Sequence, residues 1–373
     1  MKVVGIVFAN LHERNIPELT ADRTVGSIPF GCRYRLIDFT LSNMVNSGIT
    51  DIRVATQYNY QSLMDHIGSG KNWDLARHSG GIKVLPPDKQ GSPGHGASRL
   101  ETLKSIRDSL SSIKADYLIM ADCDGICNID YSAILQDHID HHADITMMVK
   151  RSPLTGTLGN RITLVESDEN GNITGLARQP GNRSEEYDIF MNVAVISGQY
   201  LRLILQEAFS RDYHSLTMDI MMKQIGNYVY RVFRYDGTFA FINSLQDYFS
   251  YSMKLLADGS FRHALFGIPE RPILTKVHNS PPTRYLEGAT VRNSLVADGC
   301  CIEGVVENSV LFRGVHIGKN AVVRNSILFQ NDRVGPGCSL NYLIADKNAV
   351  LQEGCVLSGH PLKPFFIAKS EVL

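Results

Sequence analysis

The chain contains 373 residues, of which 43% are hydrophobic and 20% are charged, with a formal net charge of −1 at pH 7. This length suggests two globular domains, and the balanced charge gives no reason to expect binding to nucleic acid or to an anionic membrane. No stretch approaches the roughly 18 apolar residues of a membrane-spanning helix, and the seven scattered cysteines are typical of a reducing compartment, so we expect a cytoplasmic protein.

Short apolar runs alternate with amphipathic stretches up to about residue 255. The expected strands are Val3–Phe8, Ile52–Ala55, Tyr117–Ala121 and Ile145–Val149, and the expected helices are Tyr34–Asn46, Leu100–Leu110 and Tyr131–His141. Apolar runs alternating with helices indicate an α/β domain whose parallel sheet is covered on both faces. Ligands of such sheets bind beyond the carboxyl ends of the strands. The turns after Phe8 and Ala121 are therefore the places where a site is expected.

A repeated pattern replaces this alternation from about residue 281. Three copies are Val291–Val296, Val306–Leu311 and Val323–Leu328, and a weaker copy is Ser339–Ile344. The asparagines at positions 293, 308, 325 and 341 recur at steps of 15, 17 and 16 residues. Because one coil of this length cannot bury its own inner face, the pattern predicts stacked coils of a left-handed parallel β-helix. We therefore expect domains at 1–255 and 281–373, joined by a linker at 256–280.

Two long segments of the first domain carry a family resemblance. They are Gly31–Phe39 (Gly-Cys-Arg-Tyr-Arg-Leu-Ile-Asp-Phe) and Leu41–Ile49 (Leu-Ser-Asn-Met-Val-Asn-Ser-Gly-Ile). Together with Thr56–Tyr58 and the spacing from Asp124 to Tyr131, they make the chain resemble the glucose-1-phosphate adenylyltransferase family over nearly its whole length. The resemblance implies a Rossmann-like nucleotidyltransferase domain, of the GT-A-like type, ahead of the β-helix.

The phosphate-binding turn of that family is replaced in this chain. Active members follow the first strand with Gly-Gly-x-Gly-x-Arg-Leu, whose backbone N–H groups cradle the nucleotide phosphates. Here the three glycine positions are Asn10, Leu11 and Glu13, and the arginine position is Asn15. Leucine blocks the close backbone approach that glycine allows, and Glu13 brings a negative charge toward a triphosphate. The neighbouring Arg14 offers at most a partial substitute.

Other residues that the reaction requires are also replaced. Val25 stands at the lysine of the family's Arg-Ala-Lys-Pro segment, and Gln179 stands at the lysine that grips the sugar phosphate. Arg99 stands at the position of an acidic residue, and Phe241 at that of the second magnesium ligand. Asp124 alone keeps a metal-carboxylate position, and we expect it to cap the turn before Tyr131 instead. Because each lost electrostatic contact costs about 10²–10³ in rate, we expect no catalytic residue, no bound metal and no cofactor in this chain.

Within the family, these losses are similar to those of the non-catalytic, D-type glycogen biosynthesis subunits. The resemblance to them rests on Phe8–Arg14 and Pro17–Thr20. It implies a regulatory subunit in a heterotetramer with a catalytic glucose-1-phosphate adenylyltransferase subunit, where only the catalytic partner binds Mg²⁺. Exposed coil edges of a β-helix must be covered or capped, so we expect the association to use the β-helix in part.

Four basic residues are candidates for binding an effector. In the family, sugar-phosphate effectors bind where the segment after the phosphate turn meets the β-helix. Arg23, Arg33 and Arg35 keep positive charge in that segment, and Lys347 is placed to contribute from the coils. Guanidinium groups bind phosphate through a bidentate fork, although structural salt bridges are a competing interpretation. Gln57, in a loop that the family associates with passing the effector signal, is a candidate relay across subunits.

Three other functions stay open from the residues alone. The first is an active sugar-nucleotide pyrophosphorylase with a divergent site. The second is a protein that binds a sugar phosphate or nucleotide on its own, without a partner. The third is a β-helix acyltransferase, for which His316 is the only histidine inside the repeats.

Overall fold

The apolar run Val3–Phe8 forms β1 at the centre of a nine-stranded sheet in the computed structural model, which describes residues 1–77, 80–86, 98–111, 113–153, 162–177 and 185–373. The sheet order is β10-β9-β11-β6-β1-β4-β5, and β8 pairs with both β11 and β12. The other strands of this sheet are β4 (Asp51–Ala55), β5 (Gly81–Leu85), β6 (Tyr117–Asp122), β8 (Ile145–Pro153), β9 (Leu164–Ser167), β10 (Ile173–Ala177), β11 (Glu186–Ser197) and β12 (Tyr230–Arg234).

The sheet is mixed, so the expectation of a parallel sheet is wrong for the pairs that β11 makes and for β9 with β10, whereas β12 pairs in parallel with β8. Strands β5, β4, β1 and β6 pair in parallel, as continuous apolar runs predict. Strand β11, however, runs antiparallel to β6, β8 and β9. Between β8 and β11 the described residues form the antiparallel pair β9–β10 and no helix. Antiparallel strands need no helical crossover, and the sequence pattern did not distinguish the two cases.

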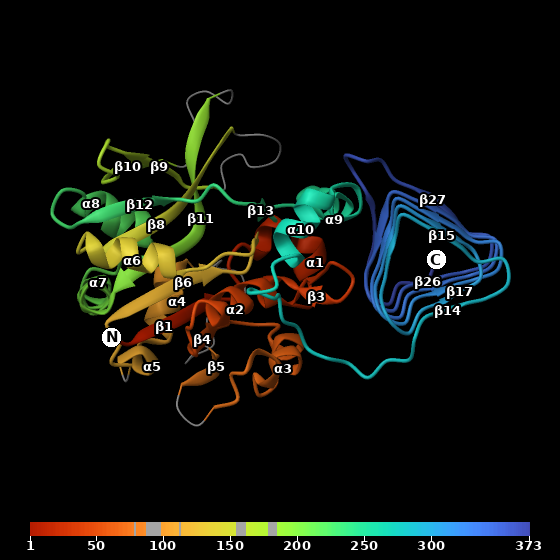
Figure 1. Cartoon of the computed structure of the whole chain (residues 1–373), viewed down its shortest axis with the longest axis horizontal. Coiled ribbons are helices and arrows are strands. Elements are labelled where there is room, and N and C mark those ends of the chain that lie inside the picture. The colour runs from red at the N-terminus through yellow and green to blue at the C-terminus, as the bar shows by residue number, and fades with distance from the viewer. Residues whose placement is uncertain (78–79, 87–97, 112, 154–161, 178–184) are drawn as a thin grey trace.

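Helices cover both faces of this sheet (Figure 1). Helix α2 begins at Leu36, two residues later than expected, because Tyr34–Arg35 pairs with Pro29–Phe30 as a short hairpin. The expected helix Leu100–Leu110 is broken at Ile106 into two pieces. The helices are α1 (Pro17–Thr20), α2 (Leu36–Asn46), α3 (Gln61–Ile67), α4 (Arg99–Ser105), α5 (Arg107–Ser111), α6 (Ser132–Asp140), α7 (Gly198–Ser210), α8 (Met222–Gln224), α9 (Leu245–Ala257) and α10 (Gly259–Phe266), with shorter turns η1 (Glu13–Asn15), η2 (Val25–Ser27) and η3 (Lys71–Trp73) and a π-helical turn η5 (Leu216–Met221).

The repeats form a β-helix with a triangular outline (Figure 1). Each of its three sides is a five-stranded parallel sheet, and Val306, Val323 and Leu340 stack inside it. The sides are β14 (Arg284–Tyr285), β17 (Cys301–Ile302), β20 (His316–Ile317), β23 (Arg333–Val334) and β26 (Val350–Leu351); β15 (Thr290–Arg292), β18 (Val305–Glu307), β21 (Val322–Arg324), β24 (Ser339–Asn341) and β27 (Val356–Ser358); and β16 (Leu295–Val296), β19 (Val310–Leu311), β22 (Ile327–Leu328), β25 (Leu343–Ala345) and β28 (Phe365–Ile367).

The fourth repeat is shifted by one residue from the expected register. Asn341 pairs with Arg324, not with Asn325. The corner that follows, which Asn293, Asn308 and Asn325 occupy with left-handed backbone angles, is taken by Tyr342 at φ 52°. The ring of Tyr342 packs against Phe249, with 6.4 Å between ring centroids, and this contact compensates for a backbone conformation that bulky residues rarely adopt.

The two domains share one apolar core. Helix α10 lies inside the segment 256–280, and its Phe261 and Leu265 are buried against the N-terminal domain. Tyr248 of α9 packs on Phe329 of the β-helix, with ring centroids 6.1 Å apart, and its hydroxyl donates to the Pro29 carbonyl at 2.7 Å. The β-helix is therefore docked on α9 by aromatic packing.

Candidate functional site

A cavity of about 340 Å³ opens beyond the carboxyl ends of β1 and β6. Residues 10–15 of the turn after β1 form one wall, and Gln57 and Tyr58 stand beside them. The rest of the lining comes from Ser98 and Arg99 at the start of α4, from Asn192 of β11, and from residues 162–163 and 215–217. The cavity lies where the sheet topology predicts a ligand site.

The turn after β1 is held by its own side chains. The Asn10 amide donates to the Tyr58 carbonyl at 3.0 Å, and its oxygen accepts from the Thr56 hydroxyl at 2.6 Å and from the Gln57 backbone N–H at 3.0 Å. Asn15 donates to the side-chain oxygen of Asn243. Asn10 and Asn15, which stand where active family members have glycine and arginine, thus use their polar groups in hydrogen bonds within this chain.

Leu11 and Glu13 are both buried in this turn. Leu11 belongs to the apolar core on the α4 face of the sheet. Glu13 is 7% exposed and accepts a hydrogen bond from the Asn10 amide. Burial raises the pKa of Glu13 to about 7, although its hydrogen bonds with Tyr58 and Asn10 oppose the shift. A carboxyl group so placed opposes the approach of a polyphosphate once it is ionised.

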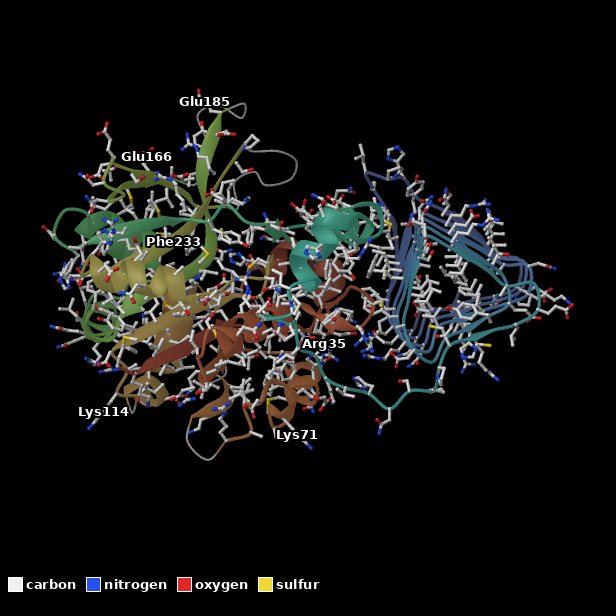
Figure 2. All side chains as sticks on the ribbon, in the orientation of Figure 1. Arg35, Lys71, Lys114, Glu166, Glu185 and Phe233 are labelled. Atoms are coloured by element: carbon white, nitrogen blue, oxygen red, sulfur yellow. The ribbon has the colours of Figure 1, made fainter. Side chains whose placement is uncertain are left out.

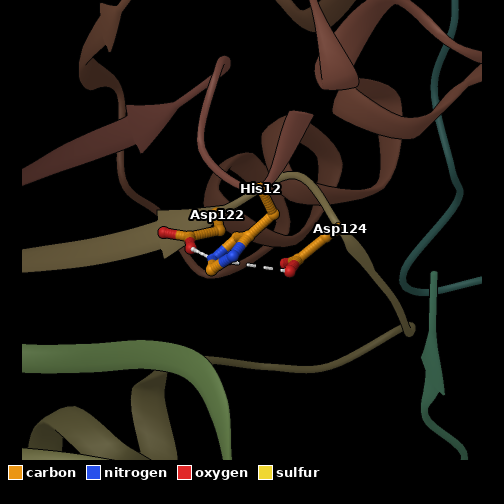
Figure 3. Close-up of side chains that lie close together, drawn as sticks. All are labelled: His12, Asp122 and Asp124. Atoms are coloured by element: carbon orange, nitrogen blue, oxygen red, sulfur yellow. Dashed lines mark hydrogen bonds and ion pairs between the residues drawn. The ribbon is translucent and has the colours of Figure 1, made fainter. Parts of the chain in front are cut away.

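The imidazole of His12, which lines the cavity, lies between two buried carboxylates (Figure 3). The His12 Nε2 atom is 2.8 Å from Asp122 Oδ2 and 3.7 Å from Asp124 Oδ2. Burial disfavours the imidazolium, but Asp124 and Asp122 outweigh burial, so the pKa of His12 is raised. Burial also raises the pKa of Asp124 to about 6, with the positive His12 opposing it.

Arg99 completes this cluster. Its Nε donates to Asp122 Oδ1 at 3.0 Å, and its Nη2 donates to Asp122 Oδ2 at 2.5 Å and to Asn192 Oδ1 at 2.6 Å. The Asn192 amide in turn donates to Asp124 Oδ2 at 2.9 Å. Hydrogen bonds therefore run from His12 through Asp122, Arg99 and Asn192 to Asp124. The 3.7 Å ion pair between Asp124 and His12 closes this ring, in which each carboxylate already has a partner.

The remaining replaced positions lie in apolar packing or outside the described residues. Val25 is buried in the core on the α2 face of the sheet. Phe241, in β13 (Ala240–Phe241), pairs with Gly125 of β7 (Gly125–Ile126) and is buried with Ile162, Leu164 and Ile189. Gln179 lies outside the described residues.

The residues at the strand ends do not fit the magnesium ion that the resemblance associates with active members. Phe241 lies next to Asp124, since Ile242 donates its backbone N–H to the Asp124 carbonyl at 2.8 Å, and a phenyl ring cannot bind Mg²⁺. Asp124 does not cap the turn before Tyr131, which corrects that expectation. Asp130 accepts from the Ser132 N–H at 2.8 Å instead, because the Asp124 side chain points toward His12 and Asn192.

The structure brings three of the four basic candidates together at the domain junction. Arg23 is 3% exposed and contacts both oxygens of Asp346 at 2.8 Å. Arg35, which lies on the side of its domain that faces the β-helix (Figure 2), donates to the Ser62 carbonyl at 2.6 Å. Burial, together with Arg35 and Arg23, lowers the pKa of Lys347 to about 7.

Arg33 lies apart from these residues. Its side chain is 54% exposed and is 3.8 Å from Asp298. Gln57, the candidate relay, donates its side-chain amide to Thr102 at 3.3 Å and so joins the turn after β1 to α4. His316 is exposed on an outer side of the β-helix.

Sequence reasoning missed His12, Asp122 and Asn192 as members of the strand-end cluster. The position of Asp122 directly after the expected strand Tyr117–Ala121 was the only available signal for it. His12 and Asn192 adopt left-handed backbone angles, with φ 69° and 59°, and Asn192 lies where the β11 register shifts. Neither feature is visible in the sequence.

Comparisons with known proteins place the chain in a family. The nucleotidyl transferase profile matches residues 15–222, and a GlmU-like, C-terminal hexapeptide profile matches residues 281–361. The chain is 32% identical to the glycogen biosynthesis protein GlgD of Bacillus subtilis (strain 168), over 100% of this chain and 97% of that relative. It is 36% identical to a GlgD of Geobacillus stearothermophilus, over 86% of this chain and 82% of that relative.

An adenylyltransferase is similar over much of the same length. The chain is 31% identical to the glucose-1-phosphate adenylyltransferase of Pseudothermotoga lettingae, over 86% of this chain and 76% of that relative. Within the described residues, no helix combines the length and apolar character needed to cross a bilayer. With a nucleotidyl transferase domain, hexapeptide coils and relatives of both names, the chain belongs to the glucose-1-phosphate adenylyltransferase family, which includes the GlgD glycogen biosynthesis proteins.

Proposed function

We propose that this chain is a regulatory, catalytically inactive subunit of glucose-1-phosphate adenylyltransferase in bacterial glycogen biosynthesis. In this role it modulates a catalytic partner that makes ADP-glucose from ATP and glucose 1-phosphate. The relatives named GlgD and glucose-1-phosphate adenylyltransferase support the pathway. The observation that carries the inactive role is the closed ring of side chains at the strand ends, where Arg99 binds Asp122 and Asn192 binds Asp124.

The chemistry of nucleotidyl transfer explains why this ring matters. The reaction requires donors and a metal ion that stabilise the charge of the displaced pyrophosphate. At the corresponding turn, this chain has Glu13, which is buried and carries a carboxyl group. Phe241 and Val25, at two more of the replaced positions, are packed in apolar clusters. Removal of several such contacts together leaves a negligible rate even when their effects are not additive.

The proposal is tested by assaying the purified chain alone and mixed with a catalytic adenylyltransferase. Alone, it is expected to form no ADP-glucose above the enzyme-free background. In the mixture, it is expected to co-purify with the catalytic subunit and to change its kcat or its response to effectors. If the chain alone turned over substrate and Asp124→Ala abolished that turnover, the chain would be an active enzyme with a divergent site. If it bound a ligand without any effect on the partner, it would be a stand-alone binding protein.

We propose further that the junction of the two domains binds an anionic effector of the sugar-phosphate class. Lys347 is close enough to Arg35, Arg23 and Lys369 for their charges to lower its pKa, while Asp346 opposes that shift. Asp346 already pairs with Arg23, and Lys369 is 3.4 Å from Asp22. The two half-buried cations Arg35 and Lys347 have no ion pair within 4 Å among the described residues, and a divalent anion between them would supply one.

Sulfate, which keeps its two charges near neutral pH, is a suitable probe of this junction. Because the pKa of Lys347 is lowered to about 7, protonation of Lys347 and therefore sulfate affinity are expected to be highest below pH 7. Affinity should fall about tenfold as the pH rises from about 6 to about 8. Calorimetric titration of the wild type and of Lys347→Gln measures this, with Arg33→Ala as the matched control. An equal pH dependence in Lys347→Gln would show that Lys347 does not bind the anion.

A further inference from the structure

The cluster at the carboxyl ends of β1 and β6 contains two buried carboxylates that require positive charge nearby. Asp122 and Asp124 are 4% and 1% exposed, and ligand atoms of His12, Asp122 and Asp124 all lie within 4.8 Å of one another. Like charges so close in a buried site strongly disfavour joint ionisation unless a cation compensates them. One imidazole and two carboxylates are also ligands that a divalent transition-metal ion accepts.

A cation is already present there, and it belongs to the chain. Arg99 takes both oxygens of Asp122, at 3.0 and 2.5 Å, in the bidentate geometry that guanidinium groups favour. Its side chain is 14% exposed, and its guanidinium also lies 5.1 Å from the centre of the Phe190 ring. The arginine is therefore fixed by polar contacts on one side and an aromatic face on another.

The backbone around the cluster is shaped to keep this arrangement. Asn192 links Arg99 to Asp124 by hydrogen bonds of 2.6 and 2.9 Å. It does so from a left-handed conformation, φ 59°, where the pairing of β11 shifts register. Bulges of this kind re-aim single side chains. The buried Asp124 Oδ1 atom accepts no hydrogen bond, so the ring still contains a carboxylate oxygen that a cation could use.

We propose that Arg99 is a resident cation that replaces a divalent metal ion at this site and closes the site to metal. Its guanidinium neutralises Asp122 directly and is held beside Asp124 through Asn192. A metal ion would need both carboxylates at once, and would meet the positive Arg99 at close range. Removal of Arg99 should therefore convert His12, Asp122 and Asp124 into an open three-ligand cation site. This inference concerns metal binding only, so it can fail while the proposed regulatory function holds, and the reverse.

The test uses Co²⁺, whose visible absorption reports the ligands around it, and the full-length chain at about pH 7.5. Wild type is expected to show no absorption bands of protein-bound cobalt. Arg99→Ala is expected to bind Co²⁺ about a hundredfold more tightly than wild type, because a unit positive charge a few ångströms from the ion is removed. Arg99→Ala/Asp124→Asn should lose this binding. Arg107→Ala, which removes a guanidinium that stacks on Phe209, is the matched control and should behave as wild type.

Variants that lose stability remain informative. If Arg99→Ala unfolds, Arg99→Gln is used, and each is melted with and without Co²⁺. A rise in melting temperature with Co²⁺ in an Arg99 variant but not in wild type supports the proposal. The proposal would be overturned if wild type bound Co²⁺ as tightly as Arg99→Ala, or if folded Arg99 variants bound no Co²⁺. It would also be overturned if Co²⁺ did not raise the melting temperature of the Arg99 variants, or if Arg99→Ala/Asp124→Asn still bound Co²⁺.

Discussion

Glu13 illustrates how a single replacement changes the turn after β1. A glycine there would leave the backbone accessible to a ligand, whereas Glu13 is buried and accepts a hydrogen bond from Asn10. Its backbone carbonyl accepts from the Thr20 hydroxyl at 3.0 Å. Because its pKa is raised from 4.5 to about 7, the folded state holds a proton that the unfolded chain loses at lower pH.

This difference predicts a pH-dependent stability at the residue scale. Between about pH 4.5 and 7 the folded state binds more protons than the unfolded state, so the contribution of Glu13 to stability is lost as the pH rises. Glu13→Gln is expected to increase the free energy of unfolding by about 2 kcal/mol at pH 8 and by little at pH 4.5. Urea denaturation at both pH values measures this. A gain that is the same at both values would show that ionisation of Glu13 is not its cause.

The corners of the β-helix show how one residue type supports an element. Asn293, Asn308 and Asn325 have φ between 41° and 47°, a conformation that asparagine tolerates better than most residues. Their side chains also bond between coils, since Asn293 donates to Asn308 at 2.7 Å and Asn325 donates to Asn341 at 2.9 Å. The corner therefore combines a backbone preference with a lateral hydrogen bond.

The two contributions can be separated at Asn325. Asn325→Ala should destabilise the protein by about 1–3 kcal/mol, because it loses both the left-handed preference and the hydrogen bond. Asn325→Gly loses the bond but keeps the backbone freedom, so it should cost about 1 kcal/mol less. Chemical denaturation followed by circular dichroism measures both. Equal losses for the two variants would assign the whole effect to the hydrogen bond.

The whole molecule depends on contacts between its two domains. Arg23 and Asp346 are separated by 323 residues in sequence and form a buried ion pair at the junction. Phe312, Phe329 and Tyr248 continue the core of the N-terminal domain into the β-helix. We therefore expect the domains to unfold together, in contrast to domains joined only by a flexible linker.

Breaking the buried pair tests this coupling. Arg23→Ala leaves Asp346 buried without its partner and should cost about 3–5 kcal/mol, whereas Arg23→Met/Asp346→Leu should recover much of that loss. Fluorescence of the single tryptophan, Trp73, reports the N-terminal domain alone, and circular dichroism reports both domains. Separate transitions by the two methods are expected for Arg23→Ala only. Wild type that already shows separate transitions would contradict the shared core.

Much of the architecture was determined by the sequence itself. The buried strand Val3–Phe8 was located with the bounds that the structure has, since a continuous apolar run is independent of distant partners. The β-helix followed from its repeats, because each coil buries its face only against an equivalent coil. The positions of Asn10, Leu11 and Glu13 after β1 were also readable, as they depend only on sequence order.

Tertiary structure decided the features that depend on distant residues. Three of these features join segments that lie far apart in the chain. Strand β11 pairs antiparallel with β6, Tyr342 at the shifted corner packs against Phe249, and Arg99 binds Asn192. Sequence periodicity describes which face of an element is buried, but not which element covers it or in which direction that element runs. The roles of His12 and Asn192 were hidden for the same reason. Their left-handed backbones are stabilised by the hydrogen bonds they make across the sheet, which form only when the strands are assembled.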